Sequence, residues 1–321
     1  MSIDASEIRK EVLKANKRIR THIRETPVEY SSYLSQRGQC EVYLKLENIQ
    51  LTGSFKLRGA MNKILSLDQS RREKGIITAS SGNHGLAFAY LSKIFDFKGT
   101  IFLPKIASNA KIKALREYGA EIKLYGEDCV KAEMKARVTA ERDGLTFISA
   151  YNDLQVIAGQ GTIGLELKTQ LKSIDAVFVP VGGGGLISGI AGYLKSGLDP
   201  IEIIGCQPSN SRVMYESIKA GQLLDLESKS TISDGSAGGI EPGAITFAMC
   251  QDMVDTWLIL SEKEIIEAIK LILAKHYFLI EGAAALSVAA FLKDKRRFQG
   301  KTVVLILSGN KISMETLKKI L

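Results

Sequence analysis

The sequence predicts an α/β fold, in which a mostly parallel sheet is covered by helices on both faces. Short apolar runs alternate with longer segments of helical periodicity along most of the chain, and this alternation is typical of parallel sheets. The run 176–181 is mostly apolar, as expected for a strand buried on both faces. With 321 residues, the chain is long enough for two domains or one large α/β unit.

The elements can be assigned in order. The chain begins with an amphipathic helix over 5–22, because Ile8, Val12 and Ile19 recur on a helical period. Two strand-like stretches follow, and a helix containing Lys56 then runs to about residue 67. The predicted strands are 27–30, 40–46, 75–79, 99–103, 121–124, 146–149, 176–181, 201–206, 256–260 and 302–307. The predicted later helices are 83–95, 107–118, 128–142, 156–171, one opened by the glycine run after 181, 212–220, 262–276, 282–292 and 314–321. Residues 222–248 read as a loop that is long for a compact domain.

Composition excludes several classes of function. Apolar residues make up 45% and charged residues 24% of the chain, which is typical of a globular protein. The net charge is 43 − 35 = +8, but the basic residues are scattered, so we expect no nucleic acid partner. The four cysteines lack zinc-site or disulfide spacing, which fits a reducing, cytoplasmic location. We predict no signal peptide, since the N-terminal segment has no apolar core, and no membrane span, since no apolar run reaches about 18 residues.

The first candidate functional residue is Lys56, in the stretch Gly53-Ser54-Phe55-Lys56-Leu57-Arg58-Gly59. It follows a glycine turn and occupies the first turn of a predicted helix that Ser54 is placed to cap. The positive end of a helix dipole disfavours a cation, and so does burial, so we expect a lowered pKa for the Lys56 amine. Such an amine forms a Schiff base with a carbonyl compound. Taken alone, such a lysine is more often an ordinary surface residue, so the interpretation of Lys56 depends on the other motifs.

The second motif, Ser80-Ser81-Gly82-Asn83-His84-Gly85, lies between a predicted strand and a predicted helix. Small residues leave the backbone N–H groups free to face a cleft, where they bind an anion such as a carboxylate. Ser81 is also a candidate for proton exchange with a substrate. A plain capped turn is the alternative for the motif, and His84 alone is more often a structural residue.

The third motif is the run Gly182-Gly183-Gly184-Gly185-Leu186, after a buried strand and before a helix. Glycines leave the backbone amides open to a phosphate, and the helix dipole attracts it. A dinucleotide fingerprint fails on spacing, because Ile187 or Ser188 stands where its last glycine is needed. A P-loop at 300–302 fails as well, since it lacks the first glycine and leads into a strand. A monophosphate is therefore the favoured ligand, and a structural turn is the alternative.

The fourth motif, Ser308-Gly309-Asn310, ends the last predicted strand. Ligands of open α/β sheets bind beyond the carboxyl ends of strands, so this motif and the two before it are placed to converge on one crevice. A plain turn is the alternative for this motif too. A reactive lysine, a monophosphate site and a carboxylate site together suggest pyridoxal 5′-phosphate and an amino acid substrate.

These motifs, with Gly159-Gln160-Gly161-Thr162, resemble the threonine/serine dehydratase and serine racemase family of the tryptophan-synthase-β-like pyridoxal phosphate enzymes. The resemblance covers nearly the whole chain. It implies two open, mostly parallel twisted sheets flanked by helices. It further implies a large domain of residues 1–49 and 149–321, a small domain of residues 50–148, and the cofactor between them. We also expect a homodimer or a higher homo-oligomer.

The resemblance assigns roles to residues by position. Lys56 would hold the cofactor aldehyde, Phe55 would pack on the ring, and Asn83 would bond the ring oxygen. The phosphate would be bound by Gly182, Gly183, Gly184, Gly185 and Leu186. Glu281 would lie near the ring, and Ser308 would face the pyridine nitrogen. The substrate would be bound by Ser80, Ser81, Gly82 and His84, with Ser81 as the opposite-face acid/base of the racemases.

The implied reaction is the dehydration and deamination of a 3-hydroxy amino acid, such as threonine or serine, to a 2-oxo acid and ammonia. A hydroxyl partner such as Ser308 does not keep the pyridine nitrogen protonated, which favours rapid loss of a β-leaving group over a long-lived carbanion. We hypothesise that Lys56 takes the Cα proton as general base. The alternatives are a serine racemase-type enzyme and a non-catalytic amino-acid-binding or nucleotide-binding protein on the same scaffold.

Three segments depart from the family pattern. Gln207-Pro208-Ser209-Asn210-Ser211-Arg212-Val213 lacks the two carboxylates of the family's divalent-cation site, so we predict no metal there. The last motif reads Ser308-Gly309-Asn310-Lys311, where the family usually has Ser-Gly-Gly-Asn. The loop 234–243 differs in length and charge from that of a threonine dehydratase, which leaves open a bulkier or differently charged substrate.

Overall fold

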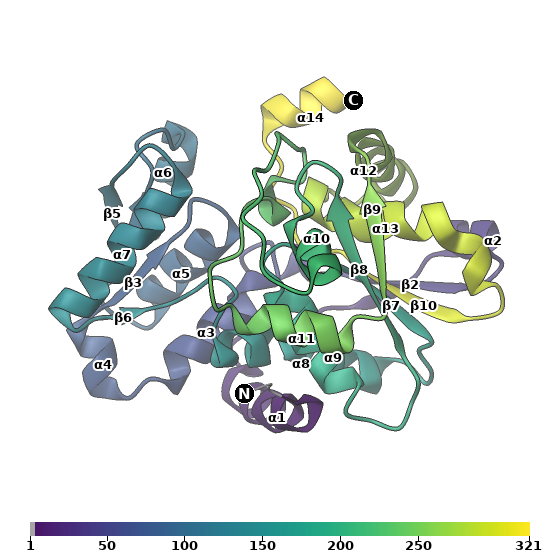
Figure 1. Ribbon diagram of the computed structural model, residues 1–321, viewed down its shortest axis with the longest axis horizontal. Helices are drawn as coiled ribbons and strands as arrows, with labels where there is room; N and C mark the ends of the chain where they lie inside the picture. Colours follow the sequence, from purple (N-terminus) through teal and green to yellow (C-terminus); the bar gives the residue numbers. More distant parts are fainter. Residues whose placement is uncertain (1–3) are drawn as a thin grey trace.

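The computed structural model describes residues 4–321 and contains two separate sheets (Figure 1). The larger has the strand order β1-β2-β10-β7-β8-β9. Its strands are β1 (Val28–Tyr30), β2 (Glu41–Lys45), β7 (Ala176–Pro180), β8 (Glu202–Pro208), β9 (Thr256–Leu260) and β10 (Thr302–Ile306). All neighbours pair in parallel except β1, which pairs antiparallel with β2 at the edge.

The smaller sheet has the order β5-β4-β3-β6 and is parallel throughout. Its strands are β3 (Ile76–Ala79), β4 (Gly99–Leu103), β5 (Glu121–Leu124) and β6 (Thr146–Phe147). In Figure 1 this sheet and its helices form the left-hand part of the molecule, and the larger sheet forms the right-hand part. The predicted fold class is therefore confirmed, whereas the domain boundaries at 49/50 and 148/149 stay a prediction.

Helices cover both sheets. The first seven are α1 (Ala5–Ile19), α2 (Ser32–Gly38), α3 (Lys56–Ser66), α4 (Gln69–Lys74), α5 (Asn83–Ile94), α6 (Asn109–Arg116) and α7 (Cys129–Asp143). The other seven are α8 (Leu154–Gln170), α9 (Gly185–Leu194), α10 (Val213–Ala220), α11 (Ile245–Met253), α12 (Glu262–His276), α13 (Gly282–Asp294) and α14 (Met314–Ile320). Within residues 4–321, none of these helices has the length and apolarity that a membrane span requires.

The sequence pattern located the long elements well but missed three helices. Helices α2 and α4 are short, with seven and six residues, and fall in stretches where too few turns exist to show a period. Helix α11 begins at Ile245, inside the stretch 222–248 that was expected to be loop, so that prediction is wrong at its C-terminal end. Its apolar residues pack in the core beneath α9, which is information that local composition does not carry.

The helices α3 and α8 cross closely between the two sheets (Figure 1). At the crossing, a Cβ on Gly159 would lie 2.5 Å from the carbonyl oxygen of Arg58 and 2.6 Å from the Cα of Gly59. Gly59 is equally constrained, since its Cβ would lie 2.7 Å from the carbonyl oxygen of Val156. The glycines of the Gly159-Gln160-Gly161-Thr162 motif therefore serve helix packing in this protein.

Candidate active site

Lys56 is the first residue of α3, as the sequence predicted, but Ser54 does not cap the helix. The N-cap residue is Phe55, which has helical backbone angles and makes no side-chain capping bond. Ser54 instead pairs through its backbone with Gly309 as an isolated antiparallel bridge. The N–H of Phe55 donates to the carbonyl oxygen of Ser308 at 3.1 Å, so the lysine loop is bound to the end of β10.

The Lys56 amine lies inside the molecule and donates to the carbonyl oxygen of Ala150 at 2.8 Å. Burial lowers the pKa of Lys56 to about 8, and the nearby Glu281 carboxylate opposes this shift. The amine also lies 5.2 Å from the centroid of the Phe55 ring. The lowered pKa agrees with the expected reactivity, with burial as its main cause.

The glycine run leads from β7 into α9 and meets the segment after Ala150. A Cβ on Gly183 would lie only 2.5 Å from the ring of Tyr151, and the carbonyl oxygen of Gly183 accepts from the Thr246 hydroxyl at 2.7 Å. Gly184 caps α9 with a φ of +88°, a left-handed conformation that favours glycine. Because Ala150 holds the Lys56 amine and its neighbour Tyr151 packs on Gly183, the lysine and the glycine run lie at one site.

Asn83 and Glu281 join the two halves of the site. The side-chain amide of Asn83, at the start of α5, donates to the two carboxylate oxygens of Glu281 at 2.9 and 3.0 Å. The backbone N–H of Lys311 donates to the same carboxylate at 2.9 Å. Burial raises the pKa of Glu281 to about 7, against the opposing effect of these hydrogen bonds. A Cβ on Gly309 would lie 2.6 Å from this carboxylate, so the loop after β10 also packs here.

The turn Ser80–Asn83 joins β3 to α5, with Gly82 as the helix N-cap. Ser81 is half-buried, and the Gly82 N–H donates to the Ser80 hydroxyl at 3.2 Å. The His84 imidazole is buried beneath the turn, with Nε2 within 3.0 Å of the Thr78 hydroxyl. Burial, with a smaller contribution from the Lys56 charge, lowers the pKa of His84 to about 3. This contact suits support of the turn, and the role of His84 in substrate binding stays a prediction.

Sequence reasoning missed the part of the site formed by the 149–152 segment and the long loop before α11. The N–H of Glu241 donates to the Tyr151 hydroxyl at 2.9 Å, and the N–H of Ile245 donates to the Asn152 side chain at 2.9 Å. Glu241 also forms an ion pair of 2.6 Å with Arg137 on α7. These residues belong to no recognisable sequence motif, and they come together only through the fold.

The residues present fit pyridoxal phosphate. The glycine run places its backbone amides at the N-terminus of α9, where the helix dipole attracts a phosphate. The Lys56 amine is available to hold an aldehyde. The buried Oδ1 of Asn83 has no hydrogen-bond partner among residues 4–321, so an acceptor is left open to a donor group of a ligand. When bound, this cofactor supplies an electron sink for chemistry at the Cα of an amino acid.

A family model described as pyridoxal-phosphate dependent enzyme matches residues 19–309. The chain belongs to this family. An L-threonine ammonia-lyase of Thermotoga maritima is 39% identical over 311 residues, which cover 97% of this chain and 77% of the relative.

Two solved structures extend the comparison. The processed threonine deaminase isoform 2 of Solanum lycopersicum has a TM-score of 0.93 at 33% identity and covers 99% of this chain and 94% of its own. The serine racemase of Dictyostelium discoideum has a TM-score of 0.88 at 35% identity, and the match covers 98% of this chain and 100% of the racemase chain.

Family membership confirms the predicted cofactor, pyridoxal 5′-phosphate, and the prediction of an enzyme. The threonine ammonia-lyase and deaminase among the relatives agree with the predicted lyase class. The roles of the individual site residues, the oligomeric state and the cytoplasmic location stay predictions.

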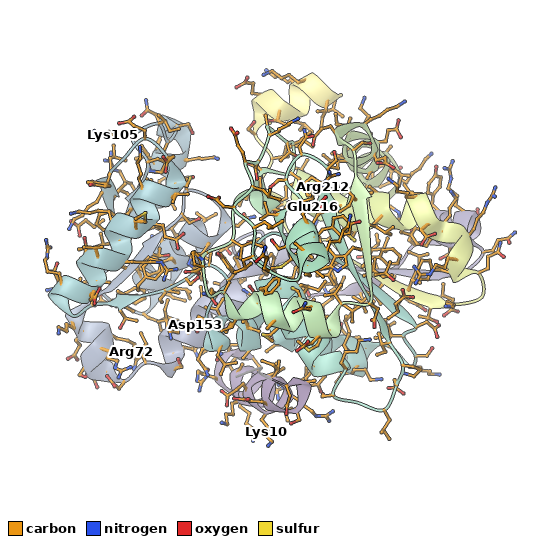
Figure 2. The ribbon with its side chains drawn as sticks, viewed as in Figure 1. Lys10, Arg72, Lys105, Asp153, Arg212 and Glu216 are labelled. Atoms are coloured by element: carbon orange, nitrogen blue, oxygen red, sulfur yellow. The ribbon has the colours of Figure 1, made fainter. Side chains whose placement is uncertain are left out.

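In this pyridoxal-phosphate enzyme, side chains of the segment 207–213 bind residues on either side of it in the chain. The buried Gln207 amide donates to the Val181 carbonyl oxygen at 3.2 Å and accepts from the Tyr215 N–H at 2.9 Å. Arg212 pairs with Glu216 at 2.9 Å (Figure 2). Within the described part of the chain, no cluster of three or more His, Cys, Asp or Glu side chains is arranged for a metal ion.

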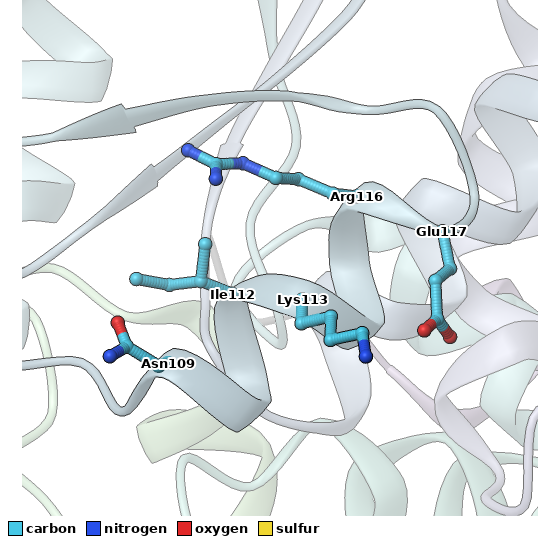
Figure 3. Close-up of a pocket in the computed structure, with 5 residues that line it drawn as sticks. All are labelled: Asn109, Ile112, Lys113, Arg116 and Glu117. Atoms are coloured by element: carbon cyan, nitrogen blue, oxygen red, sulfur yellow. The ribbon is translucent and has the colours of Figure 1, made fainter.

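A surface hollow of about 460 Å³ lies elsewhere, on the helix α6 and the residue after it (Figure 3). It is lined by Asn109, Ile112, Lys113, Arg116 and Glu117. None of these residues belongs to the site described above, so the hollow lies outside the candidate active site.

Proposed function

We propose that this protein is an ammonia-lyase that converts a 3-hydroxy amino acid, such as threonine or serine, to a 2-oxo acid and ammonia. The single observation that carries the proposal is the meeting of Lys56 and the glycine run at the 150–151 segment. A threonine ammonia-lyase and a threonine deaminase among the relatives support this reaction over others of the family.

Each part of the site has a separate role in this reaction. The Lys56 amine, with its pKa lowered to about 8, accepts the Cα proton as general base near neutral pH. The turn Ser80–Asn83 binds the substrate carboxylate through its N–H groups and the positive end of α5. The Asn83–Glu281 contact holds this turn against the loop after β10. Lys56 therefore lies between a phosphate cradle and a carboxylate site.

Amino acid racemization is the second candidate. Ser81 stands in the carboxylate turn, where a hydroxyl proton donor and acceptor on the other face of the substrate would be needed. The similarity to a serine racemase supports it. Chiral chromatography of serine incubations, alongside the release of pyruvate and ammonia, distinguishes the two. A yield of D-serine that exceeds that of ammonia would favour racemization.

The test of the site is Lys56→Ala in protein reconstituted with pyridoxal phosphate. We expect loss of the visible absorption band that borohydride bleaches in the parent, and loss of ammonia release from threonine and serine. Lys63→Ala is the matched control, since Lys63 lies on the same helix and pairs with Asp153 at 2.6 Å. An unchanged band in Lys56→Ala would refute the assignment. A parent protein that binds the cofactor but releases no ammonia from any 3-hydroxy amino acid would favour the non-catalytic alternative.

A further inference from the structure

Glu241 extends the active site beyond the residues that the motifs identified. Its backbone N–H donates to the Tyr151 hydroxyl at 2.9 Å, and its Oε1 lies 3.5 Å from the hydroxyl of Ser149. Ser149 and Tyr151 flank Ala150, whose carbonyl oxygen holds the Lys56 amine. The Glu241 carboxylate is therefore fixed to the same three-residue segment as the reactive lysine.

Arg137 brings a positive charge to this position from the smaller sheet. Its guanidinium lies 4.3 Å from the centroid of the Phe147 ring, in the strand that leads into Ser149. One of its nitrogens is 2.6 Å from Glu241 and 2.8 Å from Glu133. Two carboxylates thus surround one guanidinium, and the local charge sums to −1.

Two other cations lie near the site. Lys111 lies 4.0 Å from Asp234, in the same long loop as Glu241. The Lys311 charge acts on Glu281 and lowers the pKa of that carboxyl against the larger effect of burial. A substrate with a second carboxylate would need a cation beside the 149–151 segment, where it would instead meet Glu241.

We infer that the Arg137–Glu241 ion pair selects 3-hydroxy amino acids with a neutral side chain and rejects those with a second carboxylate. The inference rests on the proposed function and names the substrate class of that site. Glu241 acts as a specificity residue in two ways: it neutralises Arg137 and repels a carboxylate. Rejection by an unfavourable charge is an efficient source of specificity, because the penalty falls on one substrate class only.

The experiment compares aspartate with asparagine, which are nearly equal in size but differ in side-chain charge. Both lack the 3-hydroxyl group that the reaction removes. The dissociation constant of each is measured in cofactor-loaded protein from the change in visible absorption. The parent is compared with Glu241→Gln, with Glu241→Asp, which keeps the charge, and with Glu133→Gln. Glu133 is the matched control because it pairs with the same guanidinium at 2.8 Å but, within residues 4–321, makes none of the hydrogen bonds that tie Glu241 to Ser149 and Tyr151.

We expect the parent to prefer asparagine. Removing one charge at this range should shift the ratio of the two constants toward aspartate by about tenfold or more in Glu241→Gln. The shift should stay below about threefold in Glu133→Gln and in Glu241→Asp. A ratio that stays within about twofold of the parent in Glu241→Gln, or an equal shift in both glutamine variants, would overturn the inference.

A second measurement needs no variant. The parent should release ammonia faster from threonine or serine than from 3-hydroxyaspartate at equal concentration, and the reverse order would overturn the inference. If no 3-hydroxy amino acid releases ammonia, the proposed function itself fails. If threonine or serine reacts but the ratio of constants does not depend on Glu241, only the specificity inference fails.

Discussion

Replacement of Arg58 tests how much the buried ion network beside Lys56 stabilises the fold. Arg58 lies two residues after Lys56 and is fully buried. Its guanidinium binds Glu47 through two contacts of 2.8 Å and Glu166 through contacts of 2.6 and 2.8 Å. Lys45, also fully buried, lies 2.5 Å from Glu166. The network therefore contains two cations and two anions, and its charges balance.

Arg58→Met removes one cation and leaves a net charge of −1 in the interior. Removing one partner of a buried ion pair costs about 3–5 kcal/mol, because the other charge remains buried without compensation. We therefore expect the free energy of unfolding in urea to fall by about 3–5 kcal/mol. Arg58→Met combined with Glu47→Gln restores the charge balance and should recover part of the loss, which a double-mutant cycle measures.

The matched control is the exposed pair of Lys168 and Asp199, which are 2.5 Å apart with side chains 33% and 60% exposed. Lys168→Met should cost no more than about 1 kcal/mol, because water and salt screen this pair. A cost for Arg58→Met as small as that of Lys168→Met would refute the reasoning. So would a double variant less stable than Arg58→Met alone, since the charge balance would then not be what stabilises the network.

Three further predictions concern the site. Burial raises the pKa of Glu281 to about 7 from an ordinary 4.5. Between pH 4.5 and pH 7 the folded chain therefore binds a proton that the unfolded chain does not, and the stability that this proton gives is lost as the pH rises through 7. Urea unfolding at a series of pH values should show this fall in the parent but not in Glu281→Gln. The pKa of His84 is lowered to about 3, so its contribution to stability rises with pH up to 6.5, in the opposite direction and in both proteins. Gly183→Ala forces the Tyr151 ring to move and should weaken cofactor binding in equilibrium dialysis by about tenfold or more, whereas Gly197→Ala, whose Cβ meets only a carbonyl oxygen at 3.5 Å, should not. Ammonia release should survive a chelator, because the 207–213 segment has no carboxylate side chain to bind a cation. A loss of activity that magnesium restored would contradict this.

The parts of the site that could be predicted from sequence are those that follow strands. The turn Ser80–Asn83 follows β3, the glycine run follows β7, and Ser308 follows β10, so topology alone brings each to a carboxyl edge. Small residues at these turns are a local signal, since backbone groups must stay open to a ligand. The sequence predicts Lys56 in the first turn of a helix, and α3 does begin there, but only the other motifs distinguish it from an ordinary surface lysine.

The parts that could not be predicted depend on contacts between segments far apart in the chain. Arg137, Tyr151 and Glu241 lie on a helix, a connection and a long loop, and none of these has a periodic or motif-like pattern. Ser54 shows the reverse case. It has the residue type and position of a cap, but its backbone pairs with Gly309, 255 positions later in the sequence, and this contact overrides the local preference.

The contacts on the two faces of α3 determine which sheet Lys56 is held against. On its polar face, Arg58 binds Glu166 of α8 and the Asn62 amide donates to the Gln155 carbonyl oxygen of α8 at 2.7 Å. On its apolar face, Leu57 and Met61 pack in the same cluster as residues of α5. Ion pairs and hydrogen bonds fix position more narrowly than apolar contacts do, because they depend on direction as well as distance.

It follows that Lys56 is held in register with α8 and the larger sheet, although the expected boundary at 49/50 assigns it to the smaller domain. The glycine run belongs to the larger sheet as well, between β7 and α9. A shift of one sheet relative to the other would therefore leave Lys56 and Gly183 together and would move the Ser80–Asn83 turn and Arg137 against them. On the roles proposed above, the lysine and phosphate contacts of the cofactor would therefore lie within one unit, whereas its contact with Asn83 and the contacts with the substrate would lie between two.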